Sequence, residues 1–120
     1  MSKRVLVADD SSTMRKIILR SLQAVGVTDA TEAADGAEAV ETFKKQTFDL
    51  VLTDWNMPAK SGLEVIQEIR TINKTVPIIM VTTEAEKSRV MEAIQAGVSD
   101  YLIKPFTAET LREKLEKHGC

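Results

Sequence analysis

Short runs of apolar residues, separated by segments with helical spacing, constrain the fold of this chain more than any other feature. The runs are mostly β-branched or aliphatic, which is typical of strands buried on both faces of a parallel sheet. They occupy residues 5–8, 50–52, 78–81 and 101–103. The pattern therefore predicts an α/β fold built around a parallel sheet.

A strand followed by a helix, repeated five times, is the order that this pattern predicts. The first strand is expected over about residues 4–9, and the less apolar segment 28–33 is expected to be an edge strand. With residues 101–103 at the other edge, the simplest strand order is 2-1-3-4-5, the flavodoxin-like order of a doubly wound (βα)5 sheet. Its switch point lies between the first and third strands.

The helix starts follow from capping residues that have a glutamate three positions later. These pairs are Asp35 with Glu38, Ser61 with Glu64, and Thr83 with Glu86. The first and fifth helices are expected from about Thr13 and Thr107, and Gly26 is expected to end the first.

The helix faces that bury against the sheet follow from apolar residues at spacings of three and four. The residues expected to face the core are Met14, Ile17, Ile18, Leu22 and Val25 in the first helix; Ala37, Val40 and Phe43 in the second; Val65, Ile66 and Ile69 in the third; Val90, Met91 and Ile94 in the fourth; and Leu111 and Leu115 in the fifth.

Composition narrows the class of protein. A chain of 120 residues, of which 43% are hydrophobic, fits one globular domain and leaves no room for a second. The formal net charge of -2 disfavours direct binding to nucleic acid. No run approaches the roughly 20 apolar residues of a membrane span, and residues 1–4 lead straight into a strand. We therefore expect a cytoplasmic monomer without membrane insertion, in which the single Cys120 has no disulfide role.

Five polar residues stand where apolar runs stop, namely Asp9, Asp10, Asp54, Thr82 and Lys104. All strands of a parallel sheet point the same way, so the residues that follow them gather along one edge. The three acids follow the first and third strands, which flank the predicted switch point. Topology and chemistry therefore indicate the same crevice.

The acidic cluster predicts a magnesium site. Two carboxylates about 4 Å apart repel by roughly 4 kcal/mol at an effective dielectric constant near 20, and a third raises that cost. Mg²⁺ offsets such repulsion and commonly binds one or two carboxylates together with a phosphate oxygen. Phosphoryl transfer also needs a nucleophile and donors for the phosphoryl oxygens, which Asp54, Thr82 and Lys104 can supply.

The same residues resemble a known family. The set Asp9-Asp10, Asp54, Thr82 and Lys104-Pro105 is the pattern of two-component response regulator receiver domains, and the resemblance spans the whole chain. Residues 53–58, 80–85 and 104–108 are similar to the corresponding segments of chemotaxis response regulators of the CheY type.

The resemblance implies a role for each site residue. Asp54 is the expected phosphoacceptor, which takes its phosphoryl group from the phosphohistidine of a sensor histidine kinase. Asp10, Asp54 and the backbone carbonyl of Asn56 are the expected Mg²⁺ ligands, and Asp9 is expected to hold a metal-bound water. Lys104 is expected to pair with the phosphate.

A conformational switch and a rapid decay of the phosphoryl group are also implied by the resemblance. Thr82 is expected to bond a phosphate oxygen and move inward, which lets Tyr101 rotate from outside to inside. Asn56 and Glu84 are expected to flank the path of the hydrolytic water. Partners are expected to read the surface made by the fourth helix, the fifth strand and the fifth helix.

These implications predict a stand-alone response regulator, residues 1–120, without an output domain. It is expected to be a phosphoacceptor signalling protein, not an enzyme, although it assists its own phosphorylation and dephosphorylation. The expected partners are a chemotaxis kinase, the flagellar motor switch protein or another protein target, and a possible phosphatase. Thr83 and Asp100 stand where chemotaxis members often have alanine and glycine, which bears on the partner more than on the chemistry.

Three other functions fit parts of the pattern. A phosphorelay intermediate would pass the phosphoryl group to a second histidine. A magnesium-dependent phosphohydrolase shares the aspartate nucleophile, but this chain lacks the Asp-x-Asp arrangement. A flavin carrier shares the topology, but its phosphate loop would not begin with the charges of Asp9 and Asp10. Two further expectations are a half-exposed Trp55, usable as a fluorescence reporter, and a frayed His118 at the end of the last helix.

Overall fold

The computed structural model describes residues 3–55, 57–82, 87–104 and 106–119, without the side chains of residues 82 and 87–90. Strands and helices alternate along this part of the chain. They are β1 (Arg4–Ala8), α1 (Ser12–Ala24), β2 (Asp29–Ala33), α2 (Gly36–Lys45), β3 (Leu50–Thr53), α3 (Gly62–Ile72), β4 (Ile78–Thr82), α4 (Lys87–Ala96), β5 (Asp100–Ile103) and α5 (Ala108–Lys117).

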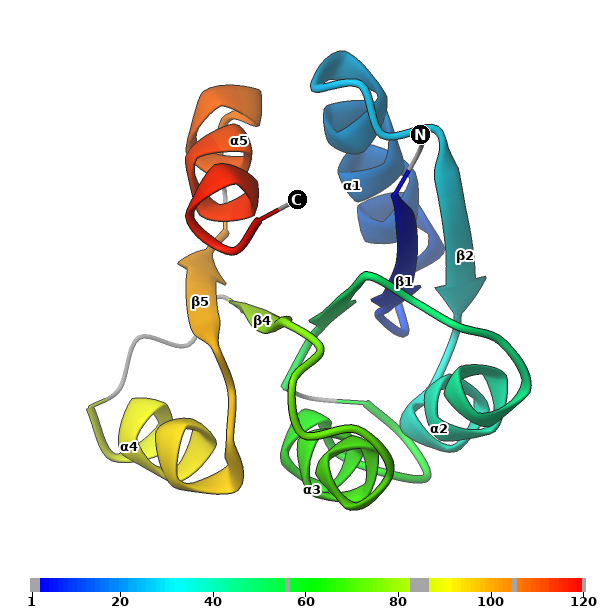
Figure 1. The fold of residues 1–120 in the computed structure, drawn as a ribbon, viewed down its shortest axis with the longest axis vertical. Helices are drawn as coiled ribbons and strands as arrows, with labels where there is room; N and C mark the ends of the chain where they lie inside the picture. Colours follow the sequence, from blue (N-terminus) through cyan, green and yellow to red (C-terminus); the bar gives the residue numbers. More distant parts are fainter. Residues whose placement is uncertain (1–2, 56, 83–86, 105, 120) are drawn as a thin grey trace.

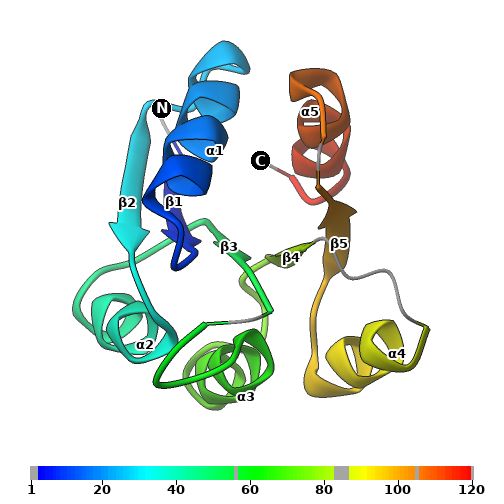
Figure 2. The ribbon, with the colours of Figure 1, turned by 180° about the vertical axis from the view of Figure 1, so that it is seen from behind.

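The five strands form one parallel sheet in the order β2-β1-β3-β4-β5. Helices α1 and α5 cover one face of this sheet, and helices α2, α3 and α4 cover the other (Figures 1 and 2). The predicted flavodoxin-like fold is confirmed, including the two edge strands. The switch point lies between β1 and β3, as expected.

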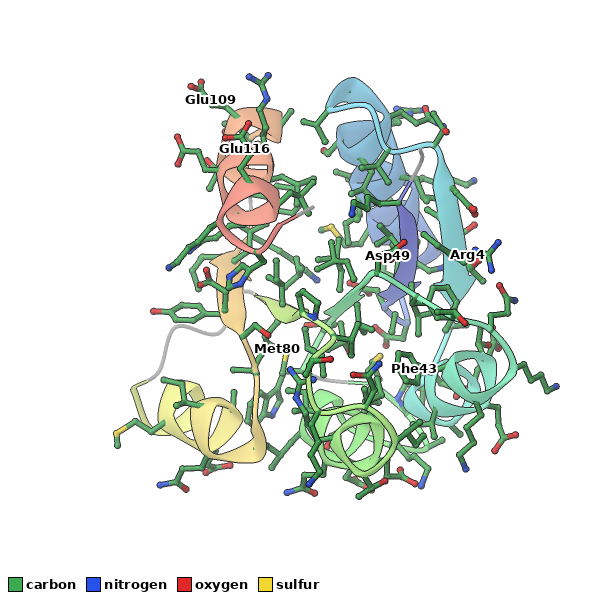
Figure 3. All side chains as sticks on the ribbon, viewed as in Figure 1. Arg4, Phe43, Asp49, Met80, Glu109 and Glu116 are labelled. Carbon is green, nitrogen blue, oxygen red and sulfur yellow. The ribbon has the colours of Figure 1, made fainter. Side chains whose placement is uncertain are left out.

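The core consists of two layers, because successive residues of a strand point to opposite faces of a sheet. In β1, Val5 and Val7 pack with α1 and α5, whereas Leu6 and Ala8 pack with α2 and α3. Figure 3 labels Phe43 and Met80, which come from α2 and β4 and belong to the second of these layers. Strands buried on both faces explain why the apolar runs in the sequence are continuous.

Two of the predicted helix starts are confirmed. The Ser61 hydroxyl accepts a hydrogen bond from the backbone N–H of Glu64, and the Glu64 carboxylate accepts one from the backbone N–H of Ser61. The Asp35 carboxylate caps α2 through the backbone N–H of Glu38. The pair Thr83 and Glu86 lies outside the described residues.

The boundaries at the end of β1 differ slightly from the expected ones. β1 ends at Ala8, before the acidic pair, and α1 begins at Ser12, one residue earlier than predicted. The reason is the Ser11 side chain, which accepts a hydrogen bond from the backbone N–H of Met14 and so acts as the N-cap. β2 likewise begins at Asp29, one residue later than expected.

The predicted buried faces of α3 and α5 are confirmed, but two of the three residues predicted to be buried in α4 are exposed, and the side chain of the third, Val90, lies outside the described part of the structure. Met91 and Ile94 are 50% and 59% exposed, and among the side chains described in α4, residues 91–96, the buried one is the small Ala93. Over residues 91–96, α4 therefore packs through a small side chain and leaves its large apolar ones on the surface. Two smaller predictions are also wrong: Ile17 of α1 is exposed, and the buried alanine of α2 is Ala39, not Ala37.

His118 does not fray, contrary to expectation. It is the C-cap of α5, and its Nε2 lies 3.0 Å from Oδ2 of Asp100 at the start of β5. Lys114 and Lys117 bring their ammonium groups to the same carboxylate, at 3.0 and 3.5 Å. This Asp100 cluster, defined by these four residues, fastens the end of α5 to the beginning of β5.

Candidate functional site

The three acidic residues of the predicted site lie together. Asp9 and Asp10 directly follow β1, and Asp54 directly follows β3. The two strands are neighbours in register, with Ala8 opposite Thr53. One carboxylate oxygen from each acid lies within 4.8 Å of the other two. The predicted convergence of the acids at the switch point is therefore present.

Lys104 joins the acids from the far side of β4. It follows β5, and its Nζ lies 2.8 Å from Oδ2 of Asp9 and 3.4 Å from Oδ2 of Asp54. The Lys104 side chain is only 8% exposed, so its positive charge acts mainly on these two carboxylates. One ammonium beside three carboxylates leaves the cluster with an excess of negative charge.

Asp9 is held rigidly, and Asp10 is open to solvent. Asp9 is 1% exposed, its Oδ1 accepts a hydrogen bond from the backbone N–H of Ser11 at 2.9 Å, and its own N–H donates to the carbonyl of Ala33 at 3.1 Å. Its carbonyl oxygen accepts a hydrogen bond from Arg15. Asp10 is exposed. The buried acid is therefore fixed, and the exposed one can meet an incoming ion.

Asp54 has a partly buried carboxylate beside a donor and a cation. Its Oδ1 accepts a hydrogen bond from the backbone N–H of Trp55 at 2.7 Å, and its Oδ2 faces Lys104. Burial raises the pKa of the Asp54 carboxyl, and the nearby Asp9 adds to the rise, although Lys104 and the Trp55 N–H oppose it. A raised pKa makes the carboxylate more basic and hence a better nucleophile than an exposed one.

Trp55 is buried, so the expectation of a half-exposed loop aromatic is wrong. Its side chain is part of the core layer under α2 and α3. Its backbone carbonyl accepts a hydrogen bond from Gly62 at 2.7 Å, which folds the segment after Asp54 back onto itself. Trp55 is thereby a fixed neighbour of the Asp54 carboxylate.

Gly62 was not singled out by the sequence pattern, although it shapes the site. A Cβ at this position would lie 2.1 Å from the carbonyl oxygen of Asp54, so the close approach of α3 to this carbonyl requires glycine. The available signal was a glycine directly after the helix-capping Ser61. Arg15 was missed in the same way, because its contact with Asp9 depends on tertiary structure.

The remaining predicted residues are placed only in part. Thr82 is the last residue of β4 and lies opposite Ile103 of β5, so its backbone is at the same edge of the sheet as the acids. Asn56 and Glu84 lie outside the described residues. Tyr101 is exposed on β5, which corresponds to the outside position expected before any switch.

The donor set fits Mg²⁺. Carboxylate oxygens are the hard ligands that this ion prefers, and it binds with one or two of them while keeping several waters. The buried Asp9, the partly buried Asp54 and the exposed Asp10 offer such oxygens and leave one side open to water and substrate. The excess negative charge of the cluster gives the ion its electrostatic attraction.

A comparison with known protein families matches residues 5–116 to the response regulator receiver domain. This chain belongs to that family. The predicted resemblance is confirmed over nearly the whole chain, and the protein is a receiver domain of two-component signalling.

Curated relatives of this receiver domain are chemotaxis proteins. The chain is 46% identical to chemotaxis protein CheY-3 of Vibrio cholerae, over 95% of this chain and 89% of the relative. It is 48% identical to chemotaxis protein CheY1 of Helicobacter pylori, over 94% of each chain. The receiver domain is thus of the CheY type.

Solved structures agree with this assignment. Chemotaxis protein CheY4 of Vibrio cholerae superposes with a TM-score of 0.91 at 35% identity, covering 98% of each chain. The receiver domain of sensor histidine kinase PA1611 from Pseudomonas aeruginosa, solved with a magnesium ion coordinated in the active site cleft, has a TM-score of 0.90 at 31% identity and covers 100% of each chain.

Proposed function

We propose that this receiver domain accepts a phosphoryl group on Asp54 from the phosphohistidine of a sensor histidine kinase, with Mg²⁺ as the required ion. The observation that carries the proposal is the meeting of the Asp9, Asp10 and Asp54 carboxylates within 4.8 Å, beside the ammonium of Lys104. Three carboxylates crowded beside one ammonium suit a site in which one acid is the phosphoacceptor and a divalent cation lies next to it.

In the proposed reaction a carboxylate oxygen of Asp54 attacks phosphorus, and the bond between phosphorus and the imidazole nitrogen breaks. The imidazole leaves with the electron pair, and Asp54 becomes an acyl phosphate. Bound Mg²⁺ supplies charge neutralisation for the phosphoryl oxygens. Asp10 and Asp54, with the backbone carbonyl of Asn56, are the proposed ligands of the ion, and Asp9 is proposed to hold a water bound to it. The Mg²⁺ ion of the PA1611 receiver domain supports this choice of metal.

Lys104 and Thr82 are the proposed donors to the new phosphoryl group. Lys104 Nζ already lies 3.4 Å from Oδ2 of Asp54, so its ammonium can form an ion pair with a phosphoryl group attached to this carboxylate. Thr82 ends β4 at the same edge and would offer its hydroxyl to a second oxygen. Lys104 directly follows β5, the strand of Tyr101, and Thr82 ends the neighbouring β4. These two strands are the proposed route from phosphorylation to a change at Tyr101.

We expect the output to be a protein contact made by α4, β5 and α5. A groove of about 400 Å³ lies there, lined by Tyr101, Leu102, Ile103, Phe106, Thr107, Thr110 and Lys114. Met91 and Ile94 of α4 add exposed apolar surface. The chemotaxis relatives support a chemotaxis kinase as donor and the flagellar motor switch protein as target. None of the described helices has the length and apolar character of a membrane span.

The decisive experiment is phosphorylation by a small phosphodonor in the presence and absence of Mg²⁺. We expect Mg²⁺-dependent labelling of the native chain and none of Asp54→Asn, which has no nucleophilic oxygen anion. Labelling should be followed by intact-mass spectrometry, which counts the added groups directly. Equal labelling of Asp54→Asn would overturn the assignment of the phosphoacceptor.

The phosphoryl group is also expected to be short-lived, because Asn56 and Glu84 are the proposed polar residues beside the hydrolytic water. Loss of label from purified phosphoprotein should be complete within minutes. Denaturing the labelled sample in parallel gives the decay of the bare acyl phosphate as a control. A native lifetime of many hours would contradict this prediction.

A phosphorelay intermediate is the second candidate function, since the PA1611 neighbour is a receiver domain of a sensor histidine kinase. The two candidate functions differ in the step after phosphorylation. A chemotaxis regulator binds a target protein, whereas a relay intermediate passes its phosphoryl group to another protein. Tighter binding of a motor-switch peptide after phosphorylation favours chemotaxis. Transfer of the label to a histidine phosphotransfer domain favours the relay.

A further inference from the structure

Arg15 links the acidic site to the neighbouring strand. It lies in the first turns of α1, and its Nη1 donates a hydrogen bond to the backbone carbonyl oxygen of Asp9 at 2.6 Å. Its Nε pairs with Oε1 of Glu32 on β2 at 2.9 Å. The Arg15 side chain is 14% exposed, whereas that of Glu32 is 44% exposed. A single guanidinium therefore ties the end of β1 to β2.

The bonded carbonyl belongs to the peptide unit that connects Asp9 to Asp10. A peptide unit is planar, so holding its carbonyl oxygen fixes the direction in which Asp10 leaves β1. Asp10 is exposed, and within the described part of the chain no hydrogen bond holds its carboxylate. The position of this carboxylate is therefore set by its backbone.

The Asp9 side chain does not depend on Arg15 in the same way. Its two carboxylate oxygens are already held by the backbone N–H of Ser11 and by the ammonium of Lys104. Any effect of Arg15 on the site is therefore expected mainly at Asp10.

We propose that Arg15 is a positioning residue, which orients the Asp9–Asp10 peptide so that the Asp10 carboxylate meets the Mg²⁺ ion, and that Glu32 holds and neutralises the guanidinium. The proposal rests on the proposed function of the site. Arg15 is not one of the proposed ligands of the ion or of the proposed donors to the phosphoryl group. The ion pair with Glu32 matters because an unpaired Arg15 guanidinium so near the acidic cluster would repel the Mg²⁺ ion.

Charge and geometry make opposite predictions for Arg15, which allows a clear test. Removing a positive charge near the site strengthens Mg²⁺ binding if only electrostatics matters. Releasing the Asp9–Asp10 peptide weakens Mg²⁺ binding if Arg15 positions Asp10. Arg15→Met removes both the charge and the hydrogen bonds. Arg15→Lys keeps the charge but replaces the planar fork, so that one group can no longer serve the carbonyl and Glu32 together.

The Mg²⁺ dissociation constant of the full chain should be measured by calorimetry and by the fluorescence of Trp55, whose backbone N–H donates a hydrogen bond to the Asp54 carboxylate. We expect Arg15→Met to raise this Kd about tenfold, as expected for loss of a charge-assisted hydrogen bond of about 1.4 kcal/mol. Arg15→Lys should raise it at least threefold. An unchanged or lower Kd for Arg15→Met, or an unchanged Kd for Arg15→Lys, would overturn the proposal.

Arg4→Met is the matched control. Arg4 also joins β1 to β2, through an ion pair of 3.4 Å with Asp29, but at the opposite end of the strand (Figure 3). Its Mg²⁺ Kd should stay within twofold of the native value, and a tenfold rise would overturn the proposal. If the native chain takes up no Mg²⁺, the proposed function fails. If it binds Mg²⁺ and both Arg15 variants bind equally well, only the role of Arg15 fails.

Discussion

Asp9, Asp10 and Asp54 repel one another when no dication is bound, and Lys104 offsets only part of this repulsion. The acids are therefore kept in place by the fold, through the sheet register and the hydrogen bonds of Asp9, at a cost in stability. Asp10 contributes to that repulsion without a hydrogen bond to compensate it among the described residues.

Asp10→Asn is accordingly expected to stabilise the metal-free protein by about 1 kcal/mol, because it removes one of three crowded charges. The same change should remove most of the stabilisation that Mg²⁺ provides, which for the native chain reaches about 2.7 kcal/mol at a concentration of 100 Kd. Urea unfolding with and without Mg²⁺ measures both effects. Lower metal-free stability of Asp10→Asn would contradict the prediction.

Gly62→Ala tests the close approach of α3 to Asp54. The added Cβ meets the Asp54 carbonyl oxygen at 2.1 Å, so the backbone beside the phosphoacceptor must shift. We expect a loss of about 2 kcal/mol in the free energy of unfolding and a slower labelling rate.

Gly26→Ala is the control for this substitution. Gly26 has φ +91° and open space around its Cβ position, so alanine there is strained but remote from the site. It should lower stability by about 1 kcal/mol and leave the labelling rate unchanged. A labelling rate for Gly62→Ala equal to that of the native chain would show that the shift does not reach Asp54.

At the scale of elements, the join between β5 and α5 depends on Asp100. Burial raises the pKa of the Asp100 carboxyl, but hydrogen bonds from His118, Lys114 and the Tyr101 N–H outweigh it and lower the pKa to about 2. The unfolded chain has an ordinary value of 3.8. The stabilisation is therefore complete above pH 4 and is lost as the pH falls through about 2.

Asp100→Asn should accordingly destabilise the protein by about 2 kcal/mol at pH 7, since one pKa unit is worth about 1.4 kcal/mol. At pH 2 the difference should be much smaller, because the native carboxyl is then about half protonated and the carboxyl of the unfolded chain almost fully so. Urea unfolding at both pH values checks this. The same difference in unfolding free energy at pH 7 and pH 2 would show that the charge of Asp100 is not the cause.

The accuracy of the sequence-based predictions also differed from element to element. α3 and α5 pack large apolar residues into the core, so their spacing predicted the buried faces correctly. α4 uses Ala93 for that contact, and Met91 and Ile94 have the spacing of a core stripe without its burial. Exposed apolar residues on one side of a helix have the same sequence pattern as buried ones.

For the whole molecule, the strand order and the meeting of the acids could be predicted, because both follow from where the apolar runs end. The roles of Arg15 and Gly62 could not be predicted, since each depends on how closely a helix approaches the backbone that follows a strand, and no apolar spacing encodes that distance. His118 was misread because its partner Asp100 is 18 residues away, and no local pattern relates them.

Lys104 connects the central and outer parts of the sheet. The acids it contacts follow β1 and β3, but the residue itself is attached to β5, an edge strand with a single neighbour. The proposed phosphoryl group on Asp54 would compete with Asp9 for this ammonium and would thereby act on β5, one of the two edge strands of the sheet. The long lysine side chain would thus carry the effect of the proposed modification from the middle of the sheet to its margin.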